Sequence, residues 1–205
     1  MNSWIQIPQK SLVQLAGAGF FALALTGCGV QSIPQAKNAT EAATAEVTNV
    51  YKRRADLIPN LVNVVKGYAS HEKETLEGVV EARAKATAVT IDPSKTSPEK
   101  LKEFQAAQGQ LSQALGRLMV VSENYPNLKA DTGFRDLQAQ LEGTENRITV
   151  ERKRLIDTIN EFNNLVTVPP TSFTNMLIYH FEKMPQWDLD SVEKTKVEKA
   201  PEVKF

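Results

Sequence analysis

Three long stretches of the chain repeat their apolar side chains every three or four residues. This spacing places the apolar groups on one face of an α-helix. The stretches run over 38–89, 98–125 and 131–168. Because a helix with one apolar stripe must bury it against another helix, the pattern predicts an all-α protein. We expect an antiparallel up-and-down four-helix bundle with a long kinked first helix, two further long helices and a short C-terminal one.

Prolines and capping residues mark the ends of these stretches. Pro59 lacks a backbone N–H and its ring clashes with the preceding turn, so we expect a kink near 56–60 in one long helix, or two helices in line. We expect the second helix to begin at Ser97-Pro98 and to end at Tyr125-Pro126, followed by a loop over 127–131. The third helix is expected to begin near Asp131 or Thr132 and to end at Pro169-Pro170. The last short helix then covers 171–183.

The N-terminal segment resembles a bacterial lipoprotein signal. Leu12–Leu25 is apolar except for Gln14, which is the length of a signal-peptide core. It ends in Leu25-Thr26-Gly27-Cys28, a sequence similar to a lipobox. In this interpretation cleavage occurs between Gly27 and Cys28, and the Cys28 thiol carries the lipid.

Two alternatives compete with lipidation of Cys28. The apolar run over 12–33 is just long enough for an uncleaved transmembrane helix, or the cysteine is a buried structural residue. The lipoprotein and transmembrane interpretations both place the rest of the chain in the cell envelope, outside the cytoplasm. In a Gram-negative host Gly29 would favour the outer membrane, facing the periplasm.

These features divide the chain into four segments. Residues 1–27 are a lipoprotein signal peptide, 28–37 a tether, 38–184 the helical bundle and 185–205 an extended C-terminal tail. Cys28 is the single cysteine of the chain, which excludes an intrachain disulfide and a cysteine-based metal site. Oligomeric state does not follow from these features.

The distribution of charged residues along the chain does not indicate a binding partner. The chain holds 24 Lys plus Arg and 24 Asp plus Glu, interleaved along its length. There is no basic face of the kind that binds nucleic acid. Attachment to the membrane would therefore depend on the acyl chains of a lipid anchor.

The motifs that carry common enzymatic chemistry are missing. His71-Glu72 resembles the start of a zinc protease motif, but Thr75 stands where the second histidine is required. Neither His71 nor His180 follows a glutamate by three residues, which argues against a di-iron bundle. The sequence contains no Gly-rich phosphate loop or nucleophile elbow. We predict no enzyme, metal or cofactor.

Charged residues on the apolar stripes are the remaining candidates for a site. Spacing places Arg54 on the buried side of the first helix, and Glu145 and Arg152 near the core face of the third. Buried charges without partners are costly, so these residues should pair across helices or lie at the edge of the bundle. They form either a polar layer that sets helix register or a ligand site.

Several motifs resemble the LemA family. They are Lys52-Arg-Arg-Ala-Asp-Leu-Ile-Pro-Asn-Leu-Val-Asn63, Lys66-Gly-Tyr-Ala-Ser-His-Glu72, Glu81-Ala-Arg83, Ala114-Leu-Gly-Arg-Leu118, Glu123-Asn-Tyr-Pro-Asn-Leu-Lys-Ala130, Leu141-Glu-Gly-Thr-Glu-Asn-Arg-Ile148, Arg152, Asn163 and Pro201-x-Val203-x-Phe205. The resemblance covers nearly the whole chain after Cys28. The chain departs from the family's usual transmembrane N-terminus, and from its usual Tyr-Asn pair at Leu155-Ile156.

The resemblance implies an antiparallel bundle of four helices, anchored by its N-terminus with the domain outside the cytoplasm. It implies no established enzymatic activity or cofactor, and it suggests binding to another envelope protein. We therefore expect a membrane-anchored scaffold or interaction module. The alternative is a carrier that binds a lipid or small molecule between its helices.

Overall fold

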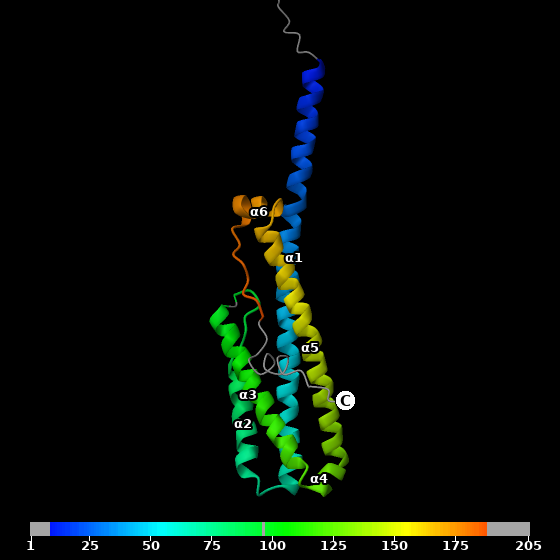
Figure 1. Ribbon diagram of the computed structural model, residues 1–205, viewed down its shortest axis with the longest axis vertical. Helices are drawn as coiled ribbons and strands as arrows, with labels where there is room; N and C mark the ends of the chain where they lie inside the picture. The colour runs from blue at the N-terminus through cyan, green and yellow to red at the C-terminus, as the bar shows by residue number, and fades with distance from the viewer. Residues whose placement is uncertain (1–8, 96, 188–205) are drawn as a thin grey trace, which may run out of the picture. The chain divides into compact units, whose positions relative to one another are not determined.

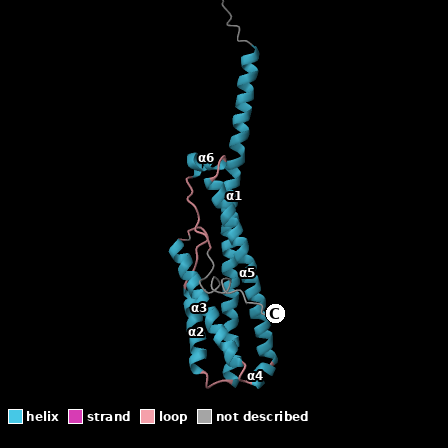
Figure 2. Cartoon of the chain, in the orientation of Figure 1, coloured by secondary structure: helices cyan, strands magenta, loops and turns pink. Residues whose placement is uncertain are grey.

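The computed structural model describes residues 9–95 and 97–187, with side chains from residue 30 onward. Helices and loops account for all of these residues, and Figure 2 shows no strand among them. The predicted all-α class is therefore confirmed. The elements, labelled in Figure 1, are α1 (Gln9–Tyr68), α2 (Lys73–Ala88), α3 (Pro98–Ser122), α4 (Pro126–Ala130), α5 (Thr132–Thr167), α6 (Thr171–Thr174) and the π-helical turn η1 (Asn175–Tyr179).

Two helices start where capping chemistry predicts. The Ser97 hydroxyl oxygen accepts a hydrogen bond from the Lys100 backbone N–H at 3.2 Å, and Pro98 is the first residue of α3. The Asp131 carboxylate accepts from the Phe134 backbone N–H at 2.8 Å at the start of α5. Each cap satisfies one of the N–H groups that a helix start leaves without an internal partner.

The chain divides into two compact units. Unit 1 holds the described residues up to Ala39 together with Thr158–Met184, and unit 2 holds Thr40–Asp157 with the described residues from Pro185 on. Helices α1 and α5 therefore contribute to both units.

Unit 2 contains a large apolar core supplied by α1, α2, α3, α4 and α5. Its fully buried large side chains are Ile58, Leu61, Val65, Leu111, Leu118, Leu128 and Phe134. Burial of each such side chain contributes about 1.5–3 kcal/mol. Tyr68, near the end of α1, is 44% exposed, and its hydroxyl donates to Asp131 Oδ2 at 2.9 Å.

Unit 1 has a smaller core. Ile33 and Ala36 of α1 pack with Phe162 and Val166 of α5, and Phe181 and Met184 cover them. The Asn163 side chain donates to the Met184 carbonyl oxygen at 3.0 Å and accepts from the Met184 N–H at 2.8 Å. This pair of bonds clamps the irregular segment after η1 to α5.

The long first helix is in fact two helices, so the prediction of one helix, or two in line, over 38–89 is wrong. The chain turns at 69–72, and α2 folds back until Arg83 Nε donates to the Ala55 carbonyl oxygen at 2.7 Å. Because both helices turn their apolar stripes to one core, the periodicity continues across the turn. The turn also contains neither Pro nor Gly, the residues that usually mark one.

Helix α1 continues through Pro59. A proline at this position leaves the Ala55 carbonyl oxygen without its usual donor four residues later. Arg83 of α2 supplies the missing donor. The acceptor that Pro59 leaves without a donor is thus satisfied by a side chain from another helix.

Three further boundaries differ from the prediction. The segment 28–37, expected to be a tether, is helical within α1, because Ile33 and Ala36 gain packing that outweighs local propensity. The expected loop at 127–131 contains α4, which starts at Pro126. The expected last helix over 171–183 ends at Tyr179. Of the predicted tail, 185–187 is described without regular structure, and the rest lies outside the described residues.

Candidate functional site

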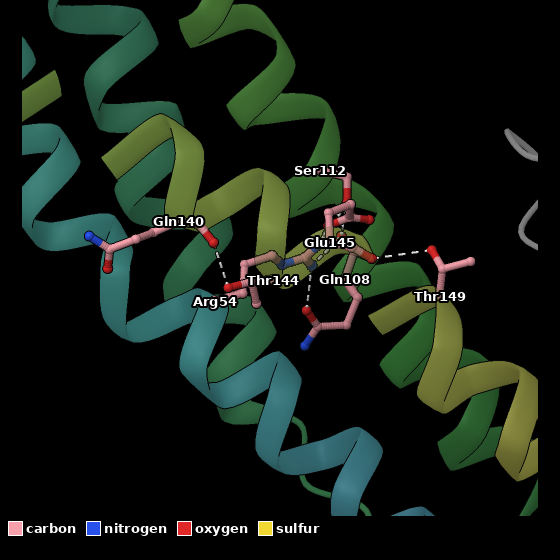
Figure 3. A network of polar contacts seen from close by, with 7 residues as sticks. All are labelled: Arg54, Gln108, Ser112, Gln140, Thr144, Glu145 and Thr149. Carbon is pink, nitrogen blue, oxygen red and sulfur yellow. Dashed lines mark hydrogen bonds and ion pairs between the residues drawn. The ribbon is translucent and has the colours of Figure 1, made fainter. Parts of the chain in front are cut away.

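A buried arginine lies at the centre of a polar network in unit 2 (Figure 3). Arg54 of α1 is only 2% exposed. Its guanidinium donates to Glu145 Oε2 at 2.8 Å, to Gln108 Oε1 at 2.8 Å and to Ser112 Oγ at 3.1 Å. A fourth, longer contact of 3.4 Å reaches the Gln108 carbonyl oxygen. Most of the guanidinium's donors are thus used within the chain.

Gln108 extends this network to a fourth helical segment. Its side-chain oxygen accepts from Arg54, and its Nε2 donates to the Ala86 carbonyl oxygen of α2 at 3.2 Å. The network therefore joins α1, α2, α3 and α5 at one level. A polar group that finds partners in only one arrangement sets the register of the helices around it.

The charge of Arg54 is only partly neutralised in the interior. Its ion-pair partner Glu145 is 55% exposed and keeps much of its hydration. The guanidinium lies 5.2 Å from the centre of the Tyr51 ring, a cation–π contact. Within the described chain, Arg54 Nε is buried without a hydrogen-bond partner.

Figure 3 also shows two threonines that bond within α5. Thr144 donates to the Gln140 carbonyl oxygen at 2.7 Å, and Thr149 donates to the Glu145 carbonyl oxygen at 3.2 Å. Both bonds satisfy the threonine hydroxyls locally, one turn back on the helix. They supply no donor toward Arg54.

A cavity of about 240 Å³ lies beside the arginine, between α1, α3 and α5. Its large apolar residues are Leu115, Met119 and Leu141, and its polar side is formed by Arg54, Ser112, Gln138, Glu142 and Glu145. It is smaller than the pockets of roughly 300–1,000 Å³ that hold drug-sized ligands.

A larger groove of about 580 Å³ lies between α1 and α2. Val62, Leu76, Val80 and Ala84 supply its apolar residues, and its charged ones are Lys66, Lys73, Glu77 and Glu81. Val80 is 52% exposed although it lies beside buried Val79. The groove therefore combines exposed apolar surface with two kinds of charge. Its lysines lie near the turn at 69–72, and its glutamates lie farther along α2.

The structure brings two of the three residues singled out on the apolar stripes together. Arg54 and Glu145 form an ion pair. Arg152 is half-buried elsewhere in unit 2, with its guanidinium 5.9 Å from the centre of the Trp187 ring. Gln108 was missed, although it follows Phe104 by four residues and precedes Leu111 by three on the stripe of α3. A polar residue at such a position is the signal that could have found it.

Two hydrogen bonds link side chains near the turn between α1 and α2 to residues around α4. The Tyr125 hydroxyl donates to Glu72 Oε1 at 3.0 Å, and this bond raises the pKa of Tyr125. The bonds from the Phe134 N–H and the Tyr68 hydroxyl lower the pKa of Asp131. His71 is exposed in the same turn.

The predicted lipidation site lies in the first part of α1. Gly27 and Cys28 belong to this helix, but their side chains lie outside the described residues. Among the residues whose side chains are described, no helix has an apolar stretch long enough to cross a membrane.

Comparison with known proteins points to one family. Residues 43–205 match the model of the LemA family. The chain is also similar to Protein LemA of Metamycoplasma hominis, with 25% identity over 166 residues that cover 77% of this chain and 71% of the relative.

Proposed function

Because the chain belongs to the LemA family, we propose that it is a membrane-anchored helical bundle that binds a second envelope protein through the groove between α1 and α2. The proposal assigns the chain a binding role and no catalytic one. Its domain stands outside the cytoplasm, at the outer membrane and in the periplasm if the host is Gram-negative.

The antiparallel four-helix arrangement is supported by the order of the contacts in unit 2. Tyr68 of α1 bonds to Asp131 at the start of α5, and Arg54, farther back along α1, bonds to Glu145, farther forward along α5. The two helices therefore run in opposite directions. Arg83 of α2 returns to Ala55 of α1 across the turn at 69–72. Such an order is typical of neighbouring helices joined by short connections.

The anchor is supported by the N-terminal sequence. The run Leu12–Leu25 and the four residues ending at Cys28 fit a lipoprotein signal. Metabolic labelling with a palmitate analogue tests this, with Cys28→Ser as the control. We expect label in the wild type only; absence of label from the wild type would contradict lipidation.

The single observation that carries the binding role is the exposed apolar groove over α2. From Lys73 to Ala84 the helix rises about 16 Å, the length of three turns of a partner helix. An amphipathic helix could place its apolar stripe against Val62, Leu76 and Val80, which is a common mode of recognition. Lys66 and Lys73 would then favour acidic residues at the end of that helix near the turn.

Site-specific photocrosslinking in native membranes tests this occupant. A benzoylphenylalanine at Val80 should give one adduct whose crosslinked peptide is an amphipathic helix with acidic residues. The same group at Val150, an exposed valine of α5, is the matched control and should give none. Lys66→Glu combined with Lys73→Glu should reduce the Val80 adduct.

The outcome that contradicts the proposal is equally specific. No adduct at Val80, equal adducts at both valines, or an adduct that lacks helical amphipathicity would each contradict helix binding in this groove. A band between two copies of the chain would show self-association instead.

A carrier role is the second candidate, and the cavity beside Arg54 is the observation that favours it. Its walls combine apolar side chains with Arg54 and the carboxylates of Glu142 and Glu145, a pattern suited to a small lipid or metabolite with an apolar body and a polar end. Native mass spectrometry of protein extracted from its own host should then show a bound species. Met119→Trp should fill the cavity and remove that species, whereas Val120→Trp, on the exposed side of α3, should not. A clean apo mass for the wild type would contradict this role.

A further inference from the structure

Unit 1 exposes a group of large apolar side chains on α6 and η1. Phe173, Met176, Leu177 and Ile178 are each between 56% and 74% exposed. In the same turn the polar residue Asn175 is buried. This pattern is the reverse of that expected for a surface turn in water, where apolar groups are buried and polar groups are hydrated. We call these four side chains the apolar cap.

Specific contacts hold the apolar cap in this arrangement. Asn175 Oδ1 accepts from the Phe181 N–H at 3.0 Å, and its Nδ2 donates to the Phe181 carbonyl oxygen at 3.0 Å. The Tyr179 hydroxyl donates to the Val30 carbonyl oxygen of α1 at 2.6 Å, and the Tyr179 and Phe181 rings stack at 5.4 Å. These bonds attach the segment that carries the apolar cap to α1 at Val30 and keep its apolar side chains exposed.

The sequence around the cap carries no formal charge. Although 23% of the chain is Asp, Glu, Lys or Arg, none of these occurs from Phe162 to Phe181. The run from Ser11 to Ala36 is equally free of them. The first charge after that run is Lys37, whose ammonium lies 5.7 Å from the centre of the Phe181 ring. The two uncharged segments meet at the Tyr179–Val30 bond.

The helix also sets the distance between Val30 and the anchor. Helix α1 is continuous from Gln9, so Val30 lies about 3 Å along the axis from Cys28 and about 4.5 Å from residue 33, where the apolar run ends. The headgroup layer on each side of a bilayer is about 5–8 Å thick. A run over 12–33 that spans the bilayer ends three residues after Val30, and a lipid on Cys28 is attached two residues before it. In either case Val30 and the Tyr179 bonded to it lie within about 5 Å of the boundary between the hydrocarbon and the headgroups.

From this geometry we infer that the apolar cap inserts into the surface of the bilayer that holds the N-terminus. The inference rests on the membrane anchoring in the proposed function and adds a second membrane contact to it. A bilayer is the partner that fits an uncharged apolar surface beside the anchor. Apolar side chains that lie at the membrane surface are buried at the boundary between the headgroups and the acyl chains. Tyrosine is also enriched at that level.

Tryptophan fluorescence in vesicles tests the insertion. The full chain, with Trp4→Phe and Trp187→Phe as background, is purified with its native anchor and reconstituted into phosphatidylethanolamine and phosphatidylglycerol vesicles with brominated acyl chains. The reporters are Leu177→Trp and, as a conservative second choice, Phe173→Trp. Val120→Trp on α3 is the matched control, because Val120 is 70% exposed. Vesicle flotation reports anchoring separately.

If the cap inserts to about 5–10 Å, bromine should remove about half or more of the emission at 177 and 173, and little at 120. Vesicles that float with the chain while all three reporters are quenched equally would overturn the insertion and leave the anchor intact. Emission at 177 that is already blue-shifted without lipid and insensitive to bromine would assign the cap to a second copy or a protein partner, which also overturns it. A chain that does not float would overturn the anchoring and, with it, the insertion.

Discussion

Replacing Arg83 with methionine tests whether a side chain of α2 compensates for a proline in α1. Pro59 cannot donate to the Ala55 carbonyl oxygen, and Arg83 Nε donates to it at 2.7 Å instead. Methionine keeps most of the apolar stem of arginine but has no donor. The Arg83→Met variant therefore leaves a carbonyl oxygen of the buried Ala55 without this partner.

The expected cost follows from the type of bond. A hydrogen bond from a charged donor contributes about 1.5–3 kcal/mol, and an unsatisfied buried acceptor costs about 1–3 kcal/mol. We therefore expect Arg83→Met to lower the free energy of unfolding by about 2 kcal/mol. In a Pro59→Ala background, residue 59 regains its N–H and can donate to the same oxygen, so the same change should cost only about 0.5–1 kcal/mol.

Urea denaturation of the full chain, followed by far-UV circular dichroism, measures this difference. The wild type, Arg83→Met, Pro59→Ala and the double variant form a double-mutant cycle, whose coupling should be about 1–1.5 kcal/mol. Arg117→Met is the matched control, because Arg117 is exposed on α3 and should change stability little. Equal costs of Arg83→Met in both backgrounds would refute the compensation.

Three further predictions concern the polar network, the α5 cap and the apolar cap. Gln108→Met should lower the free energy of unfolding by about 2–3 kcal/mol in urea denaturation, because Arg54 loses an acceptor while buried, whereas the exposed Gln110→Met should change it little. The pKa of Asp131 is lowered in the folded state, so the stability that this carboxylate contributes is present above the ordinary Asp pKa of about 3.9 and is lost as the pH falls through the lower folded-state pKa. The urea midpoint should therefore fall on acidification, and Asp131→Asn should reduce that fall; an unchanged acid profile would contradict this. Asn175→Ala removes the acceptor of the Phe181 backbone N–H, so hydrogen exchange at this amide, measured by NMR, should become about tenfold faster or more. Amides in the core of unit 2 should keep their exchange rates.

Local chemistry predicted several features of the fold from the sequence. Ser97-Pro98 and Asp131 begin α3 and α5 because a helix start needs an acceptor for its first N–H groups. The spacing also put Arg54 on the buried side of its helix, where the structure has it at 2% exposure. These features depend on residues within a few positions of one another.

The turn at 69–72 escaped prediction for a tertiary reason. The apolar stripe continues across it, since α1 and α2 both face the same core, and no local breaker marks it. Pro59 was the stronger local signal, yet α1 continues through it, and Arg83 supplies the donor that proline lacks. A contact between residues on two helices cannot be read from the spacing along one.

The sequence by itself determined that this chain is helical, where α3 and α5 begin, and that Arg54 needs partners inside. Only the tertiary structure decided that those partners are Glu145, Gln108 and Ser112, and that Arg152 lies against Trp187 instead. It also decided that η1 buries Asn175 and exposes Leu177. Helix propensity and capping act over a single turn, whereas the partner of a buried charge depends on which helices the whole core brings together.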